Sequence, residues 1–386
     1  MSAVHFTHIR PHDLLVVDGR IADLADRPDD VVTIDGKGAL ALPAPVDAHI
    51  HPDKTTWAQP WLSRTPAETL LDLIEGDVRA RADMTASVAE RAGALMDAAA
   101  ARGTRAWRAH VDIAPVYGLA GVHGVREAAL ARAHLLDVQI VAFPQLGLLT
   151  RPGTAELMER SLDEGADIIG GLDPIGVDGD LHGHLDVLFG LAERTGAPLD
   201  IHLHDGGEQG LTQVKEIARR AAGHRVTISH AFALGEDTPA ARSLDDLLAG
   251  SGVALTTCAL GADPVLPVGA LTRAGVLLAA GSDGVRDPWT PFGDGDMIAR
   301  AHLLAYRTDA RTDEELAACY TVVAHGGAAL LGLERVDLQA GDPADFVLVA
   351  AGSLAEAVVD RPVPQLVVRG GVVIARDGRL LERSPR

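Results

Sequence analysis

The stretch PAPVDAHIHPDKT, residues 43–55, sets two histidines one residue apart directly after a short apolar run. On a β-strand, side chains alternate between the two faces, so His49 and His51 would point the same way, about 7 Å apart. Two imidazoles on one face can bind one metal ion. The plainer interpretation is two histidines that face solvent or make hydrogen bonds. The pair alone does not decide between these, so the choice depends on what the rest of the chain supplies.

The bulk composition is that of an enzyme acting on small molecules rather than of a protein that binds polyanions. The 386 residues fit two medium domains or one large α/β barrel with an appendage. Hydrophobic residues make up 47% of the chain and charged residues 23%, both ordinary for a globular protein. The net charge of −20 repels phosphate groups, so we expect neither nucleic acid nor an anionic membrane as a partner.

Cysteine usage and the apolar runs predict a cytoplasmic protein. Cys258 and Cys319 lie far apart and in no CxxC pair, which argues against a disulfide framework. The first residues, MSAVHFTHIRPHD, lack the apolar core of a signal peptide. Runs such as GVLLAAG are too short to span a bilayer.

The middle of the chain alternates short β-like runs with Ala- and Leu-rich helical stretches, several of which end at a glycine. Eight strands alternating with helices indicate a (β/α)₈ barrel, although an open doubly wound sheet would also alternate. The count and the placement of polar residues favour the barrel. The expected strands are 41–49, 105–113, 138–145, 167–173, 198–204, 225–231, 252–258 and 275–283.

The two ends of the chain have a different pattern, of short strands joined by turns. Residues 12–38 and 344–381 are each too few to bury a core alone. Together they predict one small β-sandwich beside the barrel. We therefore expect residues 1–40 and 339–386 to form the sandwich and residues 41–338 to form the barrel.

Polar residues gather where the predicted strands end, which is where the active sites of such barrels lie. Any one of them has a bland explanation, because a single histidine at a strand end is more often a satisfied hydrogen-bonding group than a ligand. Their recurrence at most of the expected strands is harder to dismiss. They are His49, His51, His110, Asp112, Gln145, Asp173, His202, His204, Asp205, Ser229, His230 and Asp283.

Four of these residues make a plausible ligand set for one divalent metal ion. His49, His51, His202 and Asp283 would supply three imidazoles and one carboxylate, which suit zinc, iron or manganese. Such an ion would lower the pKa of a water molecule to roughly neutral. Asp283 could then also accept a proton, and His230 could hydrogen-bond the water or the developing oxyanion.

Six ordered motifs make the chain resemble the amidohydrolase superfamily, and within it the cytosine deaminase-like branch. The segment GDPADFVLV also resembles the strand with which that family returns to its small sandwich. The resemblance spans nearly the whole chain. Its motifs are VDAHIHPDKT, AHVDI, VAFPQLGLL, LDIHLHDGGEQG, VTISHAFALG and GSDGVRDPWTPFG.

The resemblance implies a site with one divalent metal ion, zinc or iron in preference to manganese, bound by His49, His51, His202 and Asp283. It also implies that His230 assists the water. No lysine ends the fourth strand, so the two-metal version with a carboxylated lysine is not favoured. Oligomers are common in the family, so a homo-oligomer is one expectation.

The resemblance also suggests residues that contact the substrate. Gln145 matches an amide-binding glutamine that could donate to or accept from a ring amide, and Trp289 matches a residue near the pocket mouth. His110 and His204 are further candidates for substrate binding.

Two departures from the family pattern bear on the substrate. Deaminases of this branch place a proton-shuttling glutamate where this chain has Asp205, one methylene shorter, and Glu208 could reach in from the following loop instead. Gly284 stands where cytosine deaminases carry a second aspartate that contacts substrate. Both changes imply a substrate shaped differently from cytosine.

The leading hypothesis is a metal-dependent hydrolase that attacks a C–N bond of a small nitrogen-containing substrate, with deamination of an amino-substituted heterocycle favoured. One alternative is hydrolysis of a cyclic or side-chain amide without release of ammonia. A second is a non-catalytic binding protein on the same barrel, which predicts a broken ligand set. Signatures of serine hydrolases (G-x-S-x-G), zinc proteases (HExxH), P-loops and PCxxC deaminases are absent from the sequence.

Overall fold

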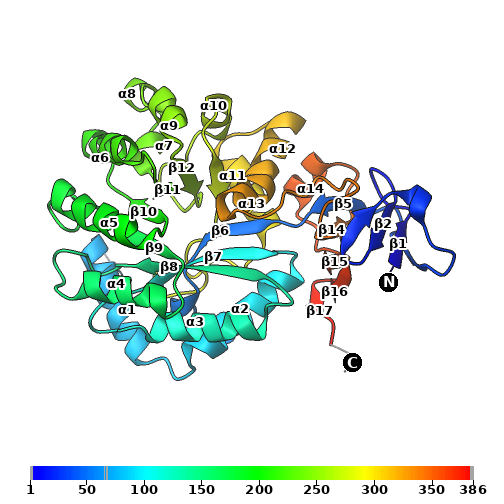
Figure 1. Ribbon diagram of the computed structural model, residues 1–386, viewed down its shortest axis with the longest axis horizontal. Coiled ribbons are helices and arrows are strands. Elements are labelled where there is room, and N and C mark those ends of the chain that lie inside the picture. The colour runs from blue at the N-terminus through cyan, green and yellow to red at the C-terminus, as the bar shows by residue number, and fades with distance from the viewer. Residues whose placement is uncertain (1–2, 65, 67, 383–386) are drawn as a thin grey trace.

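The computed structural model describes residues 3–64, 66 and 68–382. In this part of the chain, an eight-stranded parallel sheet curls into a barrel in sequence order from β6 to β13 (Figure 1). The strands are β6 (Val46–Ile50), β7 (Ala106–Asp112), β8 (Asp137–Phe143), β9 (Ile168–Leu172), β10 (Leu199–Leu203), β11 (Val226–His230), β12 (Ala254–Thr257) and β13 (Leu278–Ala280).

The barrel closes where the end of β6 meets the segment after β13. The Asp283 amide donates to the His49 carbonyl at 2.8 Å, and the His51 amide donates to the Asp283 carbonyl at 3.2 Å. Close approach at this seam needs Gly281, because a Cβ atom there would lie 2.4 Å from the Cβ of His49. The closure therefore places the first and last predicted ligands side by side.

Helices follow most of the barrel strands and surround the barrel (Figure 1). Several begin at a side chain that caps the free amides of the first turn, such as Ser87 before α2 and Asp180 before α5. The longer ones are α1 (Leu70–Ala82), α2 (Val88–Ala101), α3 (Ala120–Ala131), α4 (Thr154–Asp163), α5 (Leu181–Thr195), α6 (Gly207–Arg220), α11 (Met297–Arg307) and α12 (Asp313–Thr321). Shorter ones are η1 (Leu24–Asp26), η2 (Pro52–Lys54), α7 (Phe232–Gly235), α8 (Pro239–Arg242), α9 (Asp245–Ser251), α10 (Val268–Arg273), η3 (Val322–Gly326), α13 (Gly327–Leu331) and α14 (Leu354–Asp360).

The barrel strands are buried on both faces, and the period of two divides their side chains into two sets. In β10, Leu199, Ile201 and Leu203 belong to the apolar core that packs under the helices. Asp200 and His202, on the alternate positions, are buried in the polar interior of the barrel. The same alternation puts Trp107 among the apolar core residues and Arg108 among the polar ones. The sequence thus builds a barrel whose interior carries charge and imidazoles.

Two small sheets at the right of Figure 1 form the sandwich beside the barrel. One has the order β3-β2-β1-β4 and the other β17-β16-β15-β14-β5. They share an apolar core in which Phe6 meets Phe346 edge-on, with ring centroids 5.1 Å apart. The strands are β1 (Ala3–Thr7), β2 (Leu14–Val17), β3 (Arg20–Ala22), β4 (Val32–Asp35), β5 (Leu40–Pro43), β14 (Phe346–Val349), β15 (Leu366–Arg369), β16 (Val372–Arg376) and β17 (Arg379–Leu380).

The predicted α/β fold, a (β/α)₈ barrel with a small β-sandwich from the two ends of the chain, is confirmed. The expectation of one strand over 41–49 was wrong, because β5 pairs with β14 in the sandwich and β6 pairs with β7 in the barrel. The limits at 40/41 and 338/339 remain predictions. Among the described residues, none of the helices combines the length and the apolar character needed to cross a membrane.

Candidate metal centre and catalytic cavity

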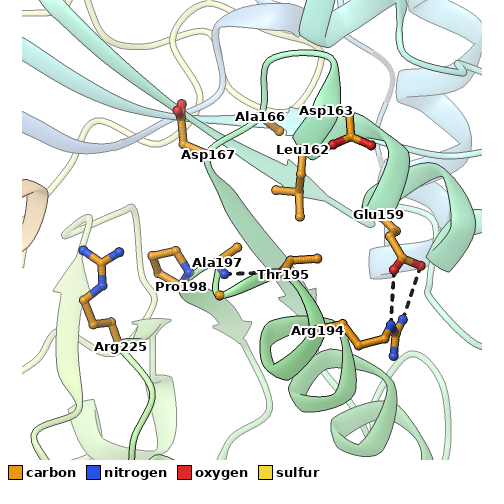
Figure 2. Close-up of a pocket in the computed structure, with 11 residues that line it drawn as sticks. Glu159, Leu162, Asp163, Ala166, Asp167, Arg194, Thr195, Ala197, Pro198 and Arg225 are labelled. Carbon is orange, nitrogen blue, oxygen red and sulfur yellow. Dashed lines mark hydrogen bonds and ion pairs between the residues drawn. The ribbon is translucent and has the colours of Figure 1, made fainter.

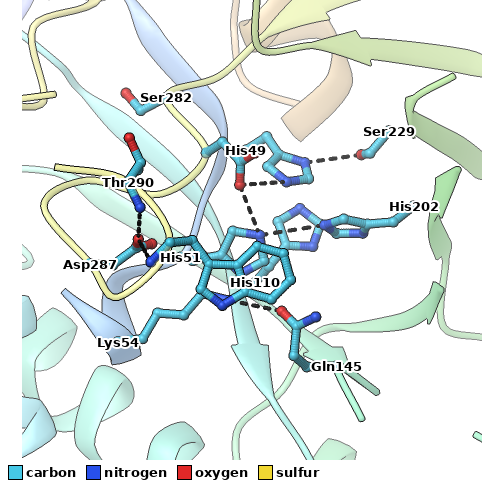
Figure 3. Close-up of polar contacts among 12 residues, drawn as sticks. His49, His51, Lys54, His110, Gln145, His202, Ser229, Ser282, Asp287 and Thr290 are labelled. Atoms are coloured by element: carbon cyan, nitrogen blue, oxygen red, sulfur yellow. Dashed lines mark hydrogen bonds and ion pairs between the residues drawn. The ribbon is translucent and has the colours of Figure 1, made fainter. Parts of the chain in front are cut away.

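Three histidines and one aspartate meet at the C-terminal end of the barrel strands. The His51 Nε2 atom lies 3.4 Å from His202 Nε2 and 3.2 Å from Asp283 Oδ1. The His49 Nε2 atom lies 3.8 Å from the same Asp283 oxygen. Figure 3 shows the imidazoles of His49 and His51, from β6 and its end, beside that of His202 from β10. The structure therefore brings together the four residues predicted as ligands.

Three contacts among these four side chains have the spacing that a bound metal ion requires. Four ligands about 2.1 Å from a tetrahedral metal lie roughly 3.4 Å from one another, close to the separations found here. The His49 Nε2 atom is buried and has no hydrogen-bond partner among the described residues. A buried nitrogen without a partner is costly unless it binds something. A non-catalytic barrel would be expected to have lost part of this set, and it is complete.

The protonation states also suit metal binding. Burial, followed by the neighbouring imidazoles, holds the pKa of His49 and of His202 well below its ordinary value. Burial, followed by the charge of Lys54, lowers the pKa of His51. Burial alone would raise the pKa of Asp283, but a hydrogen bond from His51 and the nearby imidazoles hold it well below its usual range. Neutral imidazoles and an ionised carboxylate are the forms that bind metal.

His230 ends β11 beside these residues and lines the same cavity. Its backbone has a φ of 66°, a left-handed conformation that is uncommon for a residue with a side chain. Neither ring nitrogen has a partner among the described residues. Burial lowers the pKa of His230 to about 3, so the ring is neutral and can donate one hydrogen bond. His230 thus lies beside the residues predicted to bind the metal, and its role in assisting the water stays a prediction.

His204 lies two residues after His202, lines the same cavity and is hydrogen-bonded to a buried aspartate. Its Nδ1 atom lies 2.6 Å from Asp173 Oδ2, and its amide donates to Asp173 Oδ1 at 2.6 Å. Burial opposes protonation of the ring, but the charge and hydrogen bond of Asp173 outweigh it and raise the pKa of His204. A carboxylate behind an imidazole fixes the ring and favours its protonated form.

The cavity has a volume of about 850 Å³ and combines apolar walls with a few polar groups. Lys54, which had no role assigned from sequence, is buried in its wall and donates from Nζ to Gln145 Oε1 at 2.8 Å (Figure 3). The same Nζ lies 4.9 Å from the centroid of the Trp289 ring. Because Lys54 occupies the oxygen of Gln145, the amide nitrogen is the group left to donate to a substrate. Other cavity residues missed in the sequence are Phe143, Glu68, Phe232, Asp263, Asp287 and Arg300.

The departure at Gly284 has a structural explanation. A Cβ atom at this position would lie 2.2 Å from Asp287 Oδ2, so a side chain here would displace Asp287. Asp287 lines the cavity, is buried, and accepts hydrogen bonds from the amides of Trp289 and Thr290, both at 2.8 Å. Burial raises the pKa of Asp287 to about 6. An acidic side chain is therefore present near the position where cytosine deaminases carry their second aspartate. Asp287 supplies it from three residues further along the chain than Gly284.

Besides the predicted ligand His49, three residues with predicted catalytic or substrate-binding roles do not line this cavity. Asp205 accepts hydrogen bonds from the Gly176 amide at 2.9 Å and from Gln213 Nε2 at 2.8 Å. Glu208 is exposed in the first turn of α6. His110 is buried deeper in the barrel, stacked on His49 with ring centroids 3.9 Å apart. The roles predicted for Asp205, Glu208 and His110 stay predictions, and their absence from the cavity lining argues against them.

A second hollow, of about 560 Å³, lies at the opposite end of the barrel (Figure 2). Asp167, Pro198 and Arg225, which each precede a barrel strand, help to line it, together with the exposed ion pair of Arg194 and Glu159. In barrels of this kind, catalytic residues come from the other end of the strands. None of the predicted site residues lies in this hollow, so we assign no catalytic role to it.

Comparison with known proteins agrees with this geometry. Residues 113–380 match the amidohydrolase family. The chain is 31% identical over 386 residues to N-isopropylammelide isopropyl amidohydrolase of Pseudomonas sp. (strain ADP), covering 95% of this chain and 94% of the relative.

Two solved structures extend the similarity to the fold. N-isopropylammelide isopropylaminohydrolase of Burkholderia multivorans ATCC 17616 superposes with a TM-score of 0.94 and 42% identity, covering 99% of this chain and 100% of that one. The 5-methylcytosine deaminase of Klebsiella pneumoniae, with phosphonocytosine bound, superposes with a TM-score of 0.83 and 29% identity at 99% and 100% coverage. The resemblance seen in the sequence is thereby confirmed: the chain belongs to the amidohydrolase family and is a metal-dependent hydrolase of carbon–nitrogen bonds.

Proposed function

We propose that the protein hydrolyses the bond between a nitrogen heterocycle and an exocyclic amine, releasing ammonia or a small alkylamine. The observation that carries this proposal is the meeting of four proposed ligands, three of which line a cavity that also presents Lys54, Gln145 and Trp289. The cationic Lys54 and the amide of Gln145 suit the oxo and ring-nitrogen groups of such a ring, and the Trp289 indole suits its face. The names of the similar amidohydrolase and deaminase support the same class of substrate.

We propose one divalent metal ion, zinc or iron in preference to manganese, bound by His49, His51, His202 and Asp283. When bound, such an ion would lower the pKa of a water molecule to about 7 and so supply the nucleophile. The ionised Asp283 accepts the proton of the attacking water. The neutral His230 donates a hydrogen bond to the oxyanion that develops on the ring.

We also propose that His204, backed by Asp173, delivers the proton to the leaving nitrogen. His204 lines the cavity, whereas Asp205 and Glu208 do not. The buried carboxylate of Asp173 keeps the imidazole protonated and oriented. A protonated nitrogen leaves far more readily than an amide anion, so this step should limit substrates with poor leaving groups.

A screen for amine release tests the proposed reaction. Aminopyrimidines, amino- and alkylamino-triazines and pterins are incubated with the metal-loaded protein, and free ammonia or alkylamine is measured together with metal content. We expect turnover of at least one ring class by the wild type and none by Asp283→Asn. Products opened in the ring without amine release would favour the amide alternative. Failure of the metal-loaded protein to turn over any ring would overturn the proposal.

Replacing His204 by asparagine should lower kcat by about 100-fold while the bound metal stays at the wild-type level, because general acid catalysis contributes on this scale. The loss should be larger for ammonia than for a better leaving group on the same ring. Asp205→Asn and Glu208→Gln, measured alongside, are expected to stay within a few-fold of the wild type. If one of these two is the inactive variant and His204→Asn is normal, the proton comes from that acid instead.

We propose a cytoplasmic location, because both cysteines are free and buried. The net charge of −20 supports a small-molecule substrate over nucleic acid or an anionic membrane. A homo-oligomer is also proposed, and sedimentation of the purified protein tests it.

A further inference from the structure

The three histidines of the proposed ligand set differ in how their outer nitrogens are held. The His49 Nδ1 atom lies 3.0 Å from the hydroxyl oxygen of Ser229, a contact drawn in Figure 3. His51 Nδ1 and His202 Nδ1 have no hydrogen-bond partner within the described ranges. Of these three ligands, His49 is thus the one whose ring is oriented by a hydrogen bond at its outer nitrogen.

The contact to Ser229 continues into a buried ion pair deeper in the barrel. The Ser229 hydroxyl donates to Asp200 Oδ1 at 2.6 Å, and Arg108 donates from Nη1 to Asp200 Oδ2 at 3.0 Å. Arg108 in turn bonds the Thr227 hydroxyl at 3.0 Å and the Leu330 carbonyl at 2.9 Å. Ser229 and Asp200 are fully buried and Arg108 is nearly so, which shields the whole chain of contacts from water.

The direction of these bonds fixes the tautomer of His49. A serine hydroxyl has one proton, and Ser229 uses it to donate a hydrogen bond to the carboxylate of Asp200. Its oxygen must therefore accept a hydrogen bond from His49 Nδ1–H, which leaves the lone pair of the neutral ring on Nε2. That nitrogen is the buried one without a partner, facing Asp283. The relay thus presents His49 in the one form that can bind metal through Nε2.

We propose that Ser229, Asp200 and Arg108 form a positioning relay that sets the metal affinity of the site by holding His49 in its Nδ1–H tautomer. The inference rests on the metal site proposed above and adds a role for three residues that touch neither metal nor substrate. It follows from the fold, because the period of two in β7, β10 and β11 places all three side chains inside the barrel under the ligands. Ser229 and His230 are adjacent, so β11 provides both the support for one ligand and a wall of the cavity.

The test compares Ser229→Ala with a matched variant, Thr256→Val. Thr256 lies opposite Ser229 on β12, is equally buried, and has a hydroxyl with no partner among the described residues. Both changes remove one buried hydroxyl from the same layer of the barrel, but only the first touches the relay. Metal-free protein is titrated with zinc in competition with a chromophoric chelator, and circular dichroism verifies the fold.

We expect Ser229→Ala to weaken zinc affinity by about 10- to 100-fold, the usual effect of removing a partner of a metal-binding histidine. Thr256→Val should bind zinc as the wild type does. Nitrogen-15 spectra of the metal-free protein should show His49 as the Nδ1–H tautomer in the wild type and in Thr256→Val, and a mixture of tautomers in Ser229→Ala.

Equal zinc affinity of Ser229→Ala and the wild type, or equal losses in the two variants, would overturn the relay. A wild-type protein that takes up no zinc, iron or manganese would instead overturn the metal site, so the two failures can be told apart. The nitrogen spectra keep the proposal falsifiable in that case, because they report the tautomer without any metal.

Discussion

Replacing His202 by alanine is expected to abolish turnover and to release the metal. His202 lies between the Phe143 ring, stacked at 4.0 Å, and His51 Nε2 at 3.4 Å, so its ring is held in place on both sides. Its loss would leave two imidazoles and one carboxylate, a set with fewer fixed ligands. Losing several kcal/mol of transition-state stabilisation corresponds to a fall of about 10⁴-fold in kcat.

The measurement pairs metal content after dialysis with turnover of the substrate identified in the amine-release screen. His182→Ala is the matched control, because His182 is a surface residue of α5 with a side chain 70% exposed. The control should keep both metal and activity. Full activity with bound metal in His202→Ala would show that the ligand assignment is wrong.

The features that could be predicted from the sequence are those that depend on local periodicity. A strand has a period of two whatever its surroundings, so His49 and His51 had to share a face. In a parallel barrel the strand ends meet at one rim, so His202 and Asp283 had to lie near them. The missed break between β5 and β6 also had a local signal, because Pro43 and Pro45 interrupt the expected strand 41–49.

The alternation of side chains along β10 also bears on which residue donates the proton to the leaving nitrogen. Asp200, His202 and His204 occupy alternate positions, so the last of them continues the interior face of β10. Asp205 falls on the other set of positions, and its carboxylate instead accepts hydrogen bonds from the Gly176 amide and from Gln213. The family pattern pointed to position 205, whereas the strand period alone favours His204.

Other parts of the site depend on contacts between distant segments and have no local signal. Lys54 enters the cavity because η2 turns the chain directly after His51 and because Gln145, at the end of another strand, accepts a hydrogen bond from it. Asp287 takes the place left by Gly284 only through the path of the loop after β13. The Ser229 relay joins three strands that are far apart in sequence. Such features follow from the closed barrel rather than from any one motif.

Replacing His230 by alanine is expected to lower kcat by about 1000-fold while the protein keeps its metal. His230 is 2% exposed, lines the cavity, and has both ring nitrogens free of partners among the described residues. A preorganised donor of this kind is worth about 100- to 1000-fold in kcat when it faces a developing oxyanion. The same variant should change KM little, because the hydrogen bond strengthens only as charge develops.

His230→Asn separates the lost donor from a disturbed backbone. Asparagine tolerates the left-handed φ of 66° better than most residues and restores one hydrogen-bond donor, so it should recover part of the activity. The decisive readout is metal content, because His230 also lies in a group with His49 and His202 whose ligand atoms are all within 4.8 Å of one another. If His230→Ala loses the metal as His202→Ala does, His230 is a ligand and the set built on His51 and Asp283 must be revised. If the metal stays and turnover falls, His230 acts on the reacting atoms and the ligand set stands.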